Sequence, residues 1–219
     1  MKIRENKIEK NLSPRELRDQ KIRAESITRI LNGAEKVFAK KGYDGARMSD
    51  LAEAAGLPKA NLYYYFGTKD VIYQTVIEEL LSRWDESLDV ISADKEPKEA
   101  ITQYIRAKIL YSQQHPAASK LFAKEIISGS QFFSAERGKA LRTITKKKVQ
   151  VIEIWIKEGK MSDINPYHFF FLLWSTTQYY ADFDKHIENV MKLPRLNDSV
   201  YEDAIEFVTT TVLTGCGIH

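Results

Sequence analysis

The chain has 219 residues, 43% of them hydrophobic, which is enough for one large domain or two smaller ones. Its single cysteine, Cys216, excludes a disulfide framework, and the four histidines lack the spacing of metal ligands, so we expect no metal and no cofactor. The N-terminus is too charged for a signal peptide and no apolar run reaches about 18 residues, so we expect a soluble cytoplasmic protein.

Charge is distributed unevenly along the chain. Residues 1–70 contain 15 Lys or Arg and 10 Asp or Glu, whereas residues 71–219 contain 18 and 20. This asymmetry is typical of a polyanion-binding module joined to a body that does not bind polyanions. Because the excess is small, a mildly basic solvated surface explains it equally well.

Residues 1–25 have mixed charge and no glycine, and Asn11, Ser13 and Pro14 interrupt them. We predict a basic N-terminal arm that is mobile or partly helical. Such an arm either touches the phosphates or the minor groove of DNA or is a solvated tail, and the residues leave both interpretations open.

Residues 26–41 predict the first amphipathic helix. Its apolar side chains recur with helical period: Ile27, Ile30, Leu31, Ala34, Val37 and Phe38. Gly42 is expected to end this helix, and residues 43–45 to form a turn.

Residues 48–66 predict two short helices joined by a tight turn. Ser49 is placed to cap the first helix, Gly56 suits the turn, and Pro58 starts the second helix. Helices joined so tightly cross at a large angle, which is the geometry of a helix-turn-helix. The second helix, residues 59–66, carries long polar side chains suited to the major groove of DNA.

The rest of the chain predicts helices only. A long helix over residues 69–92 begins in the helix-turn-helix unit and ends in a second domain, and helices follow at 98–114, 116–127, 135–158, 167–190 and from 198 onward. We therefore predict an all-α fold of about nine helices. Residues 26–70 would form the DNA-binding domain and residues 71–219 a domain for effector binding and dimerisation.

The helix at 167–190 contains an unusual segment. Residues 169–174 are apolar on every side, which predicts that this helix is buried all round. Ser175, Thr176, Thr177 and Gln178 follow, and buried polar groups need partners. The hydroxyls can bond back to helix carbonyls or make polar contacts across a dimer seam.

Gln178 has a different capacity, because its amide offers an acceptor and two donors that match a planar imide or amide such as a pyrimidine. Trp174 lies four residues earlier and shares its helix face. We predict a small-ligand pocket beside these two residues. Four further aromatics are weaker candidates for its wall, each with a place in the core as the alternative: Tyr179, Phe183, Trp155 and Tyr111.

The first third of the chain resembles the TetR family of one-component transcription regulators. Residues 30–80 follow that family's pattern, with Phe-x-x-x-Gly-Tyr, Ala-x-x-Ala-Gly, Leu-Tyr-Tyr-Tyr-Phe and a lysine two residues after Gly67. The sequence departs from the pattern before the two short helices, where Met48-Ser49 and Leu57-Pro58 stand. Ser49 keeps a hydroxyl there, whereas Pro58 loses a side-chain cap.

The resemblance implies roles in DNA binding by position. Arg47, Ser49 and Lys69 would contact phosphates, Tyr63 and Tyr64 would contact both phosphate and groove, and Lys59, Ala60 and Asn61 would form the base-facing tip. Their chemistry suits these roles, because cations displace counterions from phosphates, and asparagine and alanine can meet an adenine edge and a thymine methyl. The core of the three-helix unit would comprise Leu51, Ala52, Ala55, Leu62, Tyr65 and Phe66.

The C-terminal part resembles the branch of this family that contains the pyrimidine-utilisation regulator. The similar segments are Tyr-Ile-Arg at 104–106, His115-Pro116, Ser-Lys-Leu-Phe at 119–122 and WSTTQYYADF at 174–183. The eighth and ninth predicted helices, at 167–190 and from 198 onward, have apolar stripes too wide for one subunit to cover. They are therefore expected to form the seam of a homodimer.

These patterns predict a homodimeric, sequence-specific DNA-binding regulator, a repressor that a small-molecule effector releases from a palindromic operator. The alternative is a dimeric DNA-binding regulator with no small-molecule effector. An enzyme is not expected, because no Ser/His/Asp, Cys/His or paired-carboxylate arrangement has a supporting motif and no catalytic residue is assigned.

Overall fold

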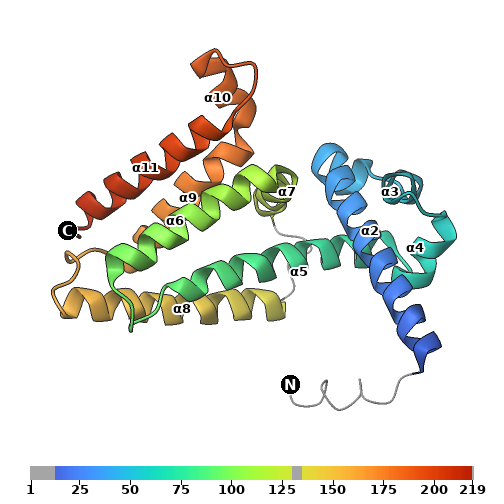
Figure 1. Ribbon diagram of the computed structural model, residues 1–219, viewed down its shortest axis with the longest axis horizontal. Coiled ribbons are helices and arrows are strands. Elements are labelled where there is room, and N and C mark those ends of the chain that lie inside the picture. The colour runs from blue at the N-terminus through green and yellow to red at the C-terminus, as the bar shows by residue number, and fades with distance from the viewer. Residues whose placement is uncertain (1–12, 130–134, 219) are drawn as a thin grey trace. The chain divides into compact units, whose positions relative to one another are not determined.

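The computed structural model describes residues 13–129 and 135–218, and within these ranges it contains helices and no strand (Figure 1). The prediction of an all-α fold is confirmed. The chain divides into two compact units, Met1–Val76 and Ile77–His219, called here the N-terminal and C-terminal units. The predicted domain boundary lay six residues earlier.

The N-terminal unit contains α2 (Pro14–Gly45), α3 (Met48–Ala55), α4 (Lys59–Phe66) and the start of α5 (Lys69–Ser87). Helix α2 begins twelve residues before the predicted start of the first helix, so residues 14–25 of the predicted arm are helical, which is one of the two forms predicted for it. Ser13 and Glu16 form a capping box, and Pro14 occupies the first turn, so the helix has a well-defined beginning. Gly42 interrupts the helical backbone with a φ of 72°, as its position predicted. The remainder of the predicted arm, residues 1–12, lies outside the described residues.

Two glycines allow α2 and α3 to meet closely. A Cβ atom at Gly33 of α2 would lie 2.8 Å from the backbone nitrogen of Ala55, so a larger residue there would push the helices apart. Gly56 ends α3 in the left-handed conformation, with φ 62° and ψ 37°, and so permits the turn into α4. Arg29 of α2 fixes this turn by donating to the carbonyl oxygens of Ala55 and Gly56 at 3.1 and 2.7 Å.

The predicted cap of α3 is wrong. The helix begins at Met48, and Ser49 is an exposed residue inside its first turn. The carboxylate of Asp50 accepts the backbone N–H of Arg47 at 3.0 Å and thereby satisfies the N–H of the cap residue. Lys41 bonds the same carboxylate at 2.9 Å, and these two interactions hold the pKa of Asp50 below its ordinary value.

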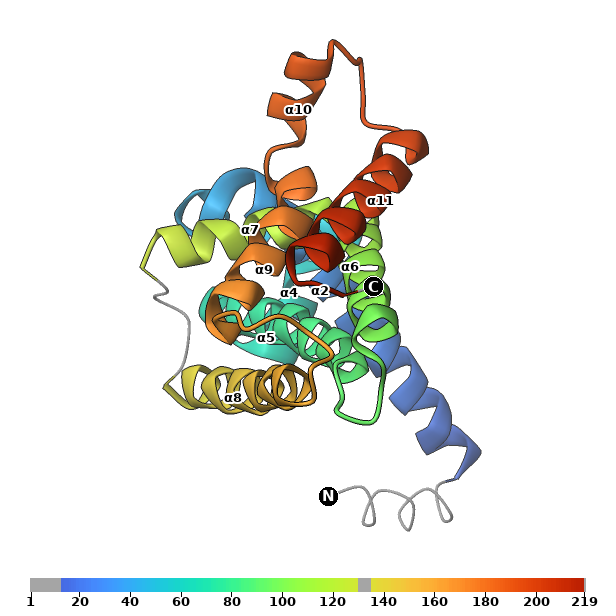
Figure 2. The same cartoon turned by 90° about the vertical axis from the view of Figure 1, so that its left-hand side faces the viewer.

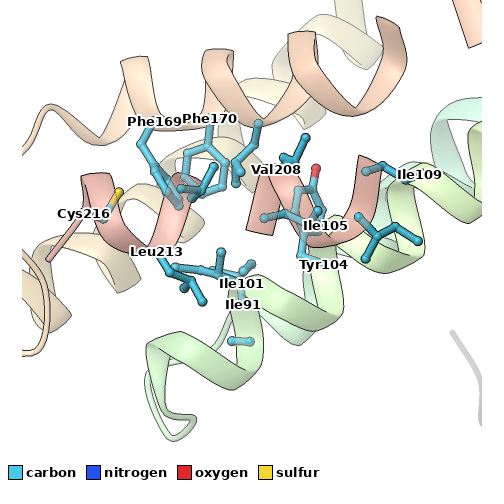
Figure 3. Close-up of a cluster of buried hydrophobic side chains, with 14 of the residues drawn as sticks. Ile91, Ile101, Tyr104, Ile105, Ile109, Phe169, Phe170, Val208, Leu213 and Cys216 are labelled. Carbon is cyan, nitrogen blue, oxygen red and sulfur yellow. The ribbon is translucent and has the colours of Figure 1, made fainter. Parts of the chain in front are cut away.

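The C-terminal unit contains the rest of α5, the short helix η2 (Leu88–Val90), α6 (Pro97–Gln114), α7 (Pro116–Ile127), α8 (Ala135–Lys157), α9 (Pro166–Asp182), α10 (Asp184–Met191) and α11 (Asp198–Gly215). Helix α6 packs against both α9 and α11 (Figure 2). Its buried face, with Ile101, Tyr104 and Ile105, meets Phe170 of α9 and Val208 of α11 in the core (Figure 3). None of the described helices is both long enough and apolar enough to cross a membrane.

The segment at 167–190 differs from its prediction in two ways. It forms two helices, because Phe183 leaves the helical conformation with φ −120° and ψ 30° and α10 starts at the next residue. Helix α9 is also not buried all round. Phe171 and Leu172 are 52% and 48% exposed, whereas Phe170 and Leu173 are buried. One face of α9 therefore lacks a covering element within the described chain.

Candidate functional site

One side of helix α4 is buried in the N-terminal unit, and the other side is exposed to solvent. Leu62 is fully buried and holds the helix in the N-terminal unit. Lys59 and Ala60 are exposed, Asn61 is half-buried, and Tyr63 and Tyr64 are 48% and 76% exposed. The predicted base-facing and groove-facing residues thus lie on the accessible part of α4. Tyr65 and Phe66, which were assigned to the core, are half-buried.

Arg47 and Ser49 lie exposed at the beginning of α3. A helix N-terminus with free backbone N–H groups and a positive side chain attracts phosphate. Both predicted phosphate contacts therefore have access to a ligand from the solvent side.

Lys69 occupies a different environment. Its ammonium donates to the carbonyl oxygens of Tyr43 and Ala46 at 2.8 and 3.1 Å and lies 4.1 Å from the centre of the Tyr43 ring. The Tyr43 hydroxyl also bonds Asp70. These contacts fasten the start of α5 to the end of α2. A lysine has three N–H donors, so one remains for the predicted phosphate contact.

The newly found part of α2 lies beside α4. Its residues Glu16, Asp19, Gln20, Ile22 and Arg23 line a shallow groove together with Tyr64 and Tyr65. The Arg23 guanidinium lies 5.9 Å from the centre of the Tyr65 ring, and Tyr64 and Tyr65 meet edge to face. The accessible surface around α4 therefore includes a turn of helix that periodicity did not predict.

The second site is a cavity of about 80 Å³ inside the C-terminal unit. Five elements and η2 contribute to its wall, which is mostly apolar: Leu81, Trp84, Asp85, Leu88, Tyr104, Lys108, Phe122, Leu141, Trp174 and Gln178. The Trp174 indole donates to the Tyr104 hydroxyl at 3.0 Å, which fixes the orientation of its ring. Both leading candidates of the predicted pocket, Trp174 and Gln178, line this cavity.

The other four predicted wall residues lie elsewhere. Tyr179 and Phe183 are 40% and 52% exposed and stack on each other with ring centres 4.9 Å apart. Trp155 is fully buried in the hydrophobic core. Tyr111 is half-buried, and its ring meets the ring of the wall residue Trp84 edge to face.

The hydroxyls that precede Gln178 are satisfied within their own helix. Ser175 and Thr176 donate to the carbonyl oxygen of Leu172 at 3.0 and 2.8 Å, and Thr177 donates to that of Leu173 at 2.7 Å. Back-bonding therefore accounts for these three residues. The Gln178 amide makes no hydrogen bond with any described residue, which leaves it available to a ligand.

Lys108 is a cavity residue that the sequence analysis did not assign to a site. It is only 3% exposed, and its ammonium lies 3.8 Å from the centre of the Trp84 ring. Burial lowers the pKa of Lys108 to about 7, against the opposing influence of Asp182. Its signal in the sequence is a lysine inside the apolar stripe of α6, between Ile105 and Ile109.

The neighbouring carboxylates are already engaged. Asp85 pairs with Arg137 at 2.6 Å. Asp182 accepts the Ser119 hydroxyl at 2.6 Å, and burial raises the pKa of Asp182. Among the described residues, no group of three or more His, Cys, Asp or Glu could hold a metal ion.

A helix-turn-helix unit with an accessible second helix, followed by an all-α unit with an internal cavity, defines the class of one-component transcription regulators. Family models match both parts: "Bacterial regulatory proteins, tetR family" over residues 30–76 and "YcdC-like protein, C-terminal region" over residues 77–219. The chain belongs to the TetR family of DNA-binding transcription regulators, which are not enzymes.

Two full-length relatives illustrate the similarity. The transcriptional regulator RutR of Escherichia coli (strain K12) is 34% identical over 186 residues, which is 85% of this chain and 88% of RutR. The transcriptional repressor NicS of Pseudomonas putida is 23% identical over 192 residues, which is 85% of this chain and 90% of NicS.

Solved structures agree with the fold. The regulator SCO4942 of Streptomyces coelicolor matches with a TM-score of 0.68 and 18% identity, covering 86% of this chain and 97% of that one. PfmR of Thermus thermophilus, a TetR family regulator, matches with a TM-score of 0.65 and 23% identity, covering 84% and 94%. At these identities the likeness supports the fold alone.

Proposed function

We propose that the chain is a cytoplasmic homodimeric repressor, and that a small planar molecule in the cavity of the C-terminal unit releases it from a palindromic operator. The single observation that carries this proposal is the cavity itself. The unpaired Gln178 amide and the fixed Trp174 ring line it, and α5 contributes part of its wall.

Helix α4 enters the major groove in this proposal. The base edges are met by Lys59, Ala60 and Asn61. The DNA phosphate backbone and the wall of the groove are contacted by Tyr63 and Tyr64. Arg47, Ser49 and the remaining N–H of Lys69 bind phosphates on either side. Two copies of this arrangement related by a twofold axis match a palindrome.

The uncovered apolar face of α9 supports dimerisation. Phe171, Leu172 and Tyr179 are 40–52% exposed on α9, and Phe207 of the adjacent α11 is 68% exposed. A hollow between these helices is lined by Ser175, Thr176, Tyr179, Tyr180, Phe207 and Val208. Such a patch on two neighbouring helices suits contact with the same patch of a second subunit.

Helix α5 connects ligand binding in the cavity with DNA binding by the N-terminal unit. Leu81, Trp84 and Asp85 of α5 line the cavity, and the same helix starts at Lys69, which is bonded to the end of α2. A ligand that binds one placement of α5 more tightly than another shifts the population of the two placements. The spacing of the two α4 helices in the dimer changes with it, and operator affinity falls.

The size and chemistry of the cavity favour a single-ring ligand. The cavity of about 80 Å³ is several times the ~10–15 Å³ that one water needs and smaller than the roughly 150 Å³ of an engineered cavity that binds benzene, so a ligand no larger than a single ring is favoured. The Gln178 amide matches an imide edge, and the resemblance to the branch of the pyrimidine-utilisation regulator points the same way. The proposed effector is therefore pyrimidine-like.

Thermal unfolding of the full chain with a panel of pyrimidines and related ring metabolites tests the proposal. At least one compound should raise the Tm of the wild-type protein, because a ligand bound only to the folded state stabilises it by mass action. Gln178→Ala should remove that rise while operator binding persists.

Gln150→Ala, at an exposed position of α8, is the matched control and should keep the full response. A panel without any stabilising compound would favour the alternative of a dimeric regulator without an effector. A normal response of the Gln178→Ala variant would remove Gln178 from the site.

A further inference from the structure

Three polar groups on residues of the cavity wall have no hydrogen-bonding partner among the described residues. They are the ammonium of Lys108, the indole N–H of Trp84 and the amide of Gln178. They belong to α6, α5 and α9, three different helices around one cavity, and the Trp84 N–H is itself fully buried. Two of the three can only donate hydrogen bonds.

Of these three groups, the ammonium of Lys108 has the greatest need for a partner, because it carries a charge. Its contact with the Trp84 ring is electrostatic but provides no hydrogen-bond acceptor. Burial of an unpaired cation is unfavourable, and a lysine in such a place loses its proton readily. The pKa of about 7 agrees with an ammonium that is still without a close counter-charge.

The charged and titratable groups that the structure describes around Lys108 do not supply that counter-charge. Asp85 of α5 pairs with Arg137 of α8, and Asp182 at the end of α9 accepts the Ser119 hydroxyl of α7. Asp182 is near enough to favour the charged lysine, but the two form no ion pair. Lys120 of α7 pairs with Asp184, and burial raises the pKa of Tyr104, which keeps its proton.

We propose that the effector is a small planar acid whose carboxylate binds Lys108 and the indole N–H of Trp84 while its ring binds Gln178. This inference rests on the proposed function, since it names the chemical class of the same effector. A carboxylate supplies both the negative charge and the several acceptor positions that the two donors need. A neutral pyrimidine would satisfy Gln178 and leave the lysine without a counter-charge.

The position of Lys108 also links the acid to α5. The ammonium rests against the ring of Trp84, which belongs to the helix that continues into the N-terminal unit. A carboxylate that bonds both Lys108 and the Trp84 N–H adds a direct contact between ligand and α5. Acidic ligands should therefore release the operator more strongly than neutral ligands of the same ring.

Calorimetric titration of the full-length protein with matched ring compounds tests this inference. The pairs are uracil with uracil-6-carboxylate and benzamide with benzoate. In each pair the acid should bind wild-type protein about tenfold or more tightly than its neutral partner, because hydrogen bonds between charged groups are the stronger ones. At pH 7 binding of the acid should take up about half a proton, because a lysine with a pKa of about 7 is half deprotonated before the acid arrives.

Lys108→Met keeps the stem of the side chain and removes its charge. It should weaken binding of the acids by roughly 10- to 100-fold, abolish the proton uptake and leave the neutral partners within about twofold. Lys146→Met, at an exposed position of α8, is the control and should change none of these values. If the methionine variant does not fold, Lys108→Gln carries the same test.

The outcomes separate this inference from the proposed function. If neutral rings bind in a Gln178-dependent manner and the acids bind no better, the effector site stands and the acidic class is wrong. A preference for the acids that survives in Lys108→Met also overturns the role of Lys108. If wild-type protein binds none of the four compounds nor any other small ring, acidic or neutral, the effector site and this inference fail together.

Discussion

Arg29 and Lys69 in the N-terminal unit differ from Lys108 in the C-terminal unit in how their charge is satisfied. In the N-terminal unit Arg29 and Lys69 donate to backbone carbonyls at helix ends, so each charge fastens one element to another. In the C-terminal unit Lys108 is buried against a tryptophan ring with no acceptor among the described residues. The difference shows that the charges of Arg29 and Lys69 are satisfied within the folded chain, whereas the charge of Lys108 has no hydrogen-bond acceptor among the described residues.

The largest effect should come from removing the unsatisfied cation. Lys108→Met should stabilise the ligand-free protein by on the order of 1–4 kcal/mol at pH 6, because an unpaired buried charge is replaced by an apolar chain. The folded-state pKa of Lys108, about 7, lies below its ordinary value of 10.5, so the unfolded chain binds more protons between these values and wild-type stability rises with pH.

The advantage of Lys108→Met should therefore be full below about pH 7 and fade as the pH rises toward 10.5. Urea unfolding of both proteins at several pH values measures it. A methionine variant that is less stable than wild type at pH 6 would show that the lysine is satisfied in the folded protein, and the contrast between the units would disappear.

The opposite result is expected for a cation that fastens two elements. Lys69→Met should lower the stability of the N-terminal unit by about 1–3 kcal/mol, because two carbonyl oxygens lose a charged donor. Hydrogen exchange of α2 and α5 amides measures the loss, with Lys40→Met at an exposed position as control.

Operator binding as a function of salt separates the two roles of Lys69. A phosphate contact by its third N–H predicts that the slope of log affinity against log salt flattens by about 1 in Lys69→Met. A slope equal to that of wild type would show that Lys69 makes no phosphate contact and only joins the start of α5 to the end of α2.

The outward-facing groups of α4 should affect specificity more than stability. Asn61→Ala should cost about 1–3 kcal/mol of discrimination at one base pair and leave non-specific affinity unchanged. Selection of binding sites from random DNA by each variant detects the change, with Gln74→Ala on α5 as the control. Equal sequence preference in both variants would exclude Asn61 from the base-contacting tip.

The helix-turn-helix could be predicted because its local signals agree. Leu51, Ala55 and Leu62 mark the buried faces, and Gly56 marks the turn where the backbone is left-handed. The first turns of α2 carry no apolar stripe, so periodicity left a mobile arm and a partly helical arm both open. The pair Ser13 and Glu16, a capping box, was the signal available there.

The C-terminal unit was harder to predict because its features depend on contacts between distant segments. The helix breaks at Phe183, although neither proline nor glycine occurs there to indicate a break in the sequence. The exposure of Phe171 could not follow from an apolar run, since such a run does not show which neighbour is missing. The shared helix face of Trp174 and Gln178 is visible in the sequence, whereas the position of Lys108 within the apolar stripe of α6 does not show that its ammonium lies against Trp84.

The central claim is that a ligand in the cavity controls DNA binding through α5. Its most direct test is to measure the operator Kd with and without a saturating cavity ligand, and the ligand Kd with and without operator. The ligand should raise the operator Kd by roughly 5- to 150-fold, and the operator should raise the ligand Kd by the same factor. An operator Kd that does not change at saturating ligand would contradict the account.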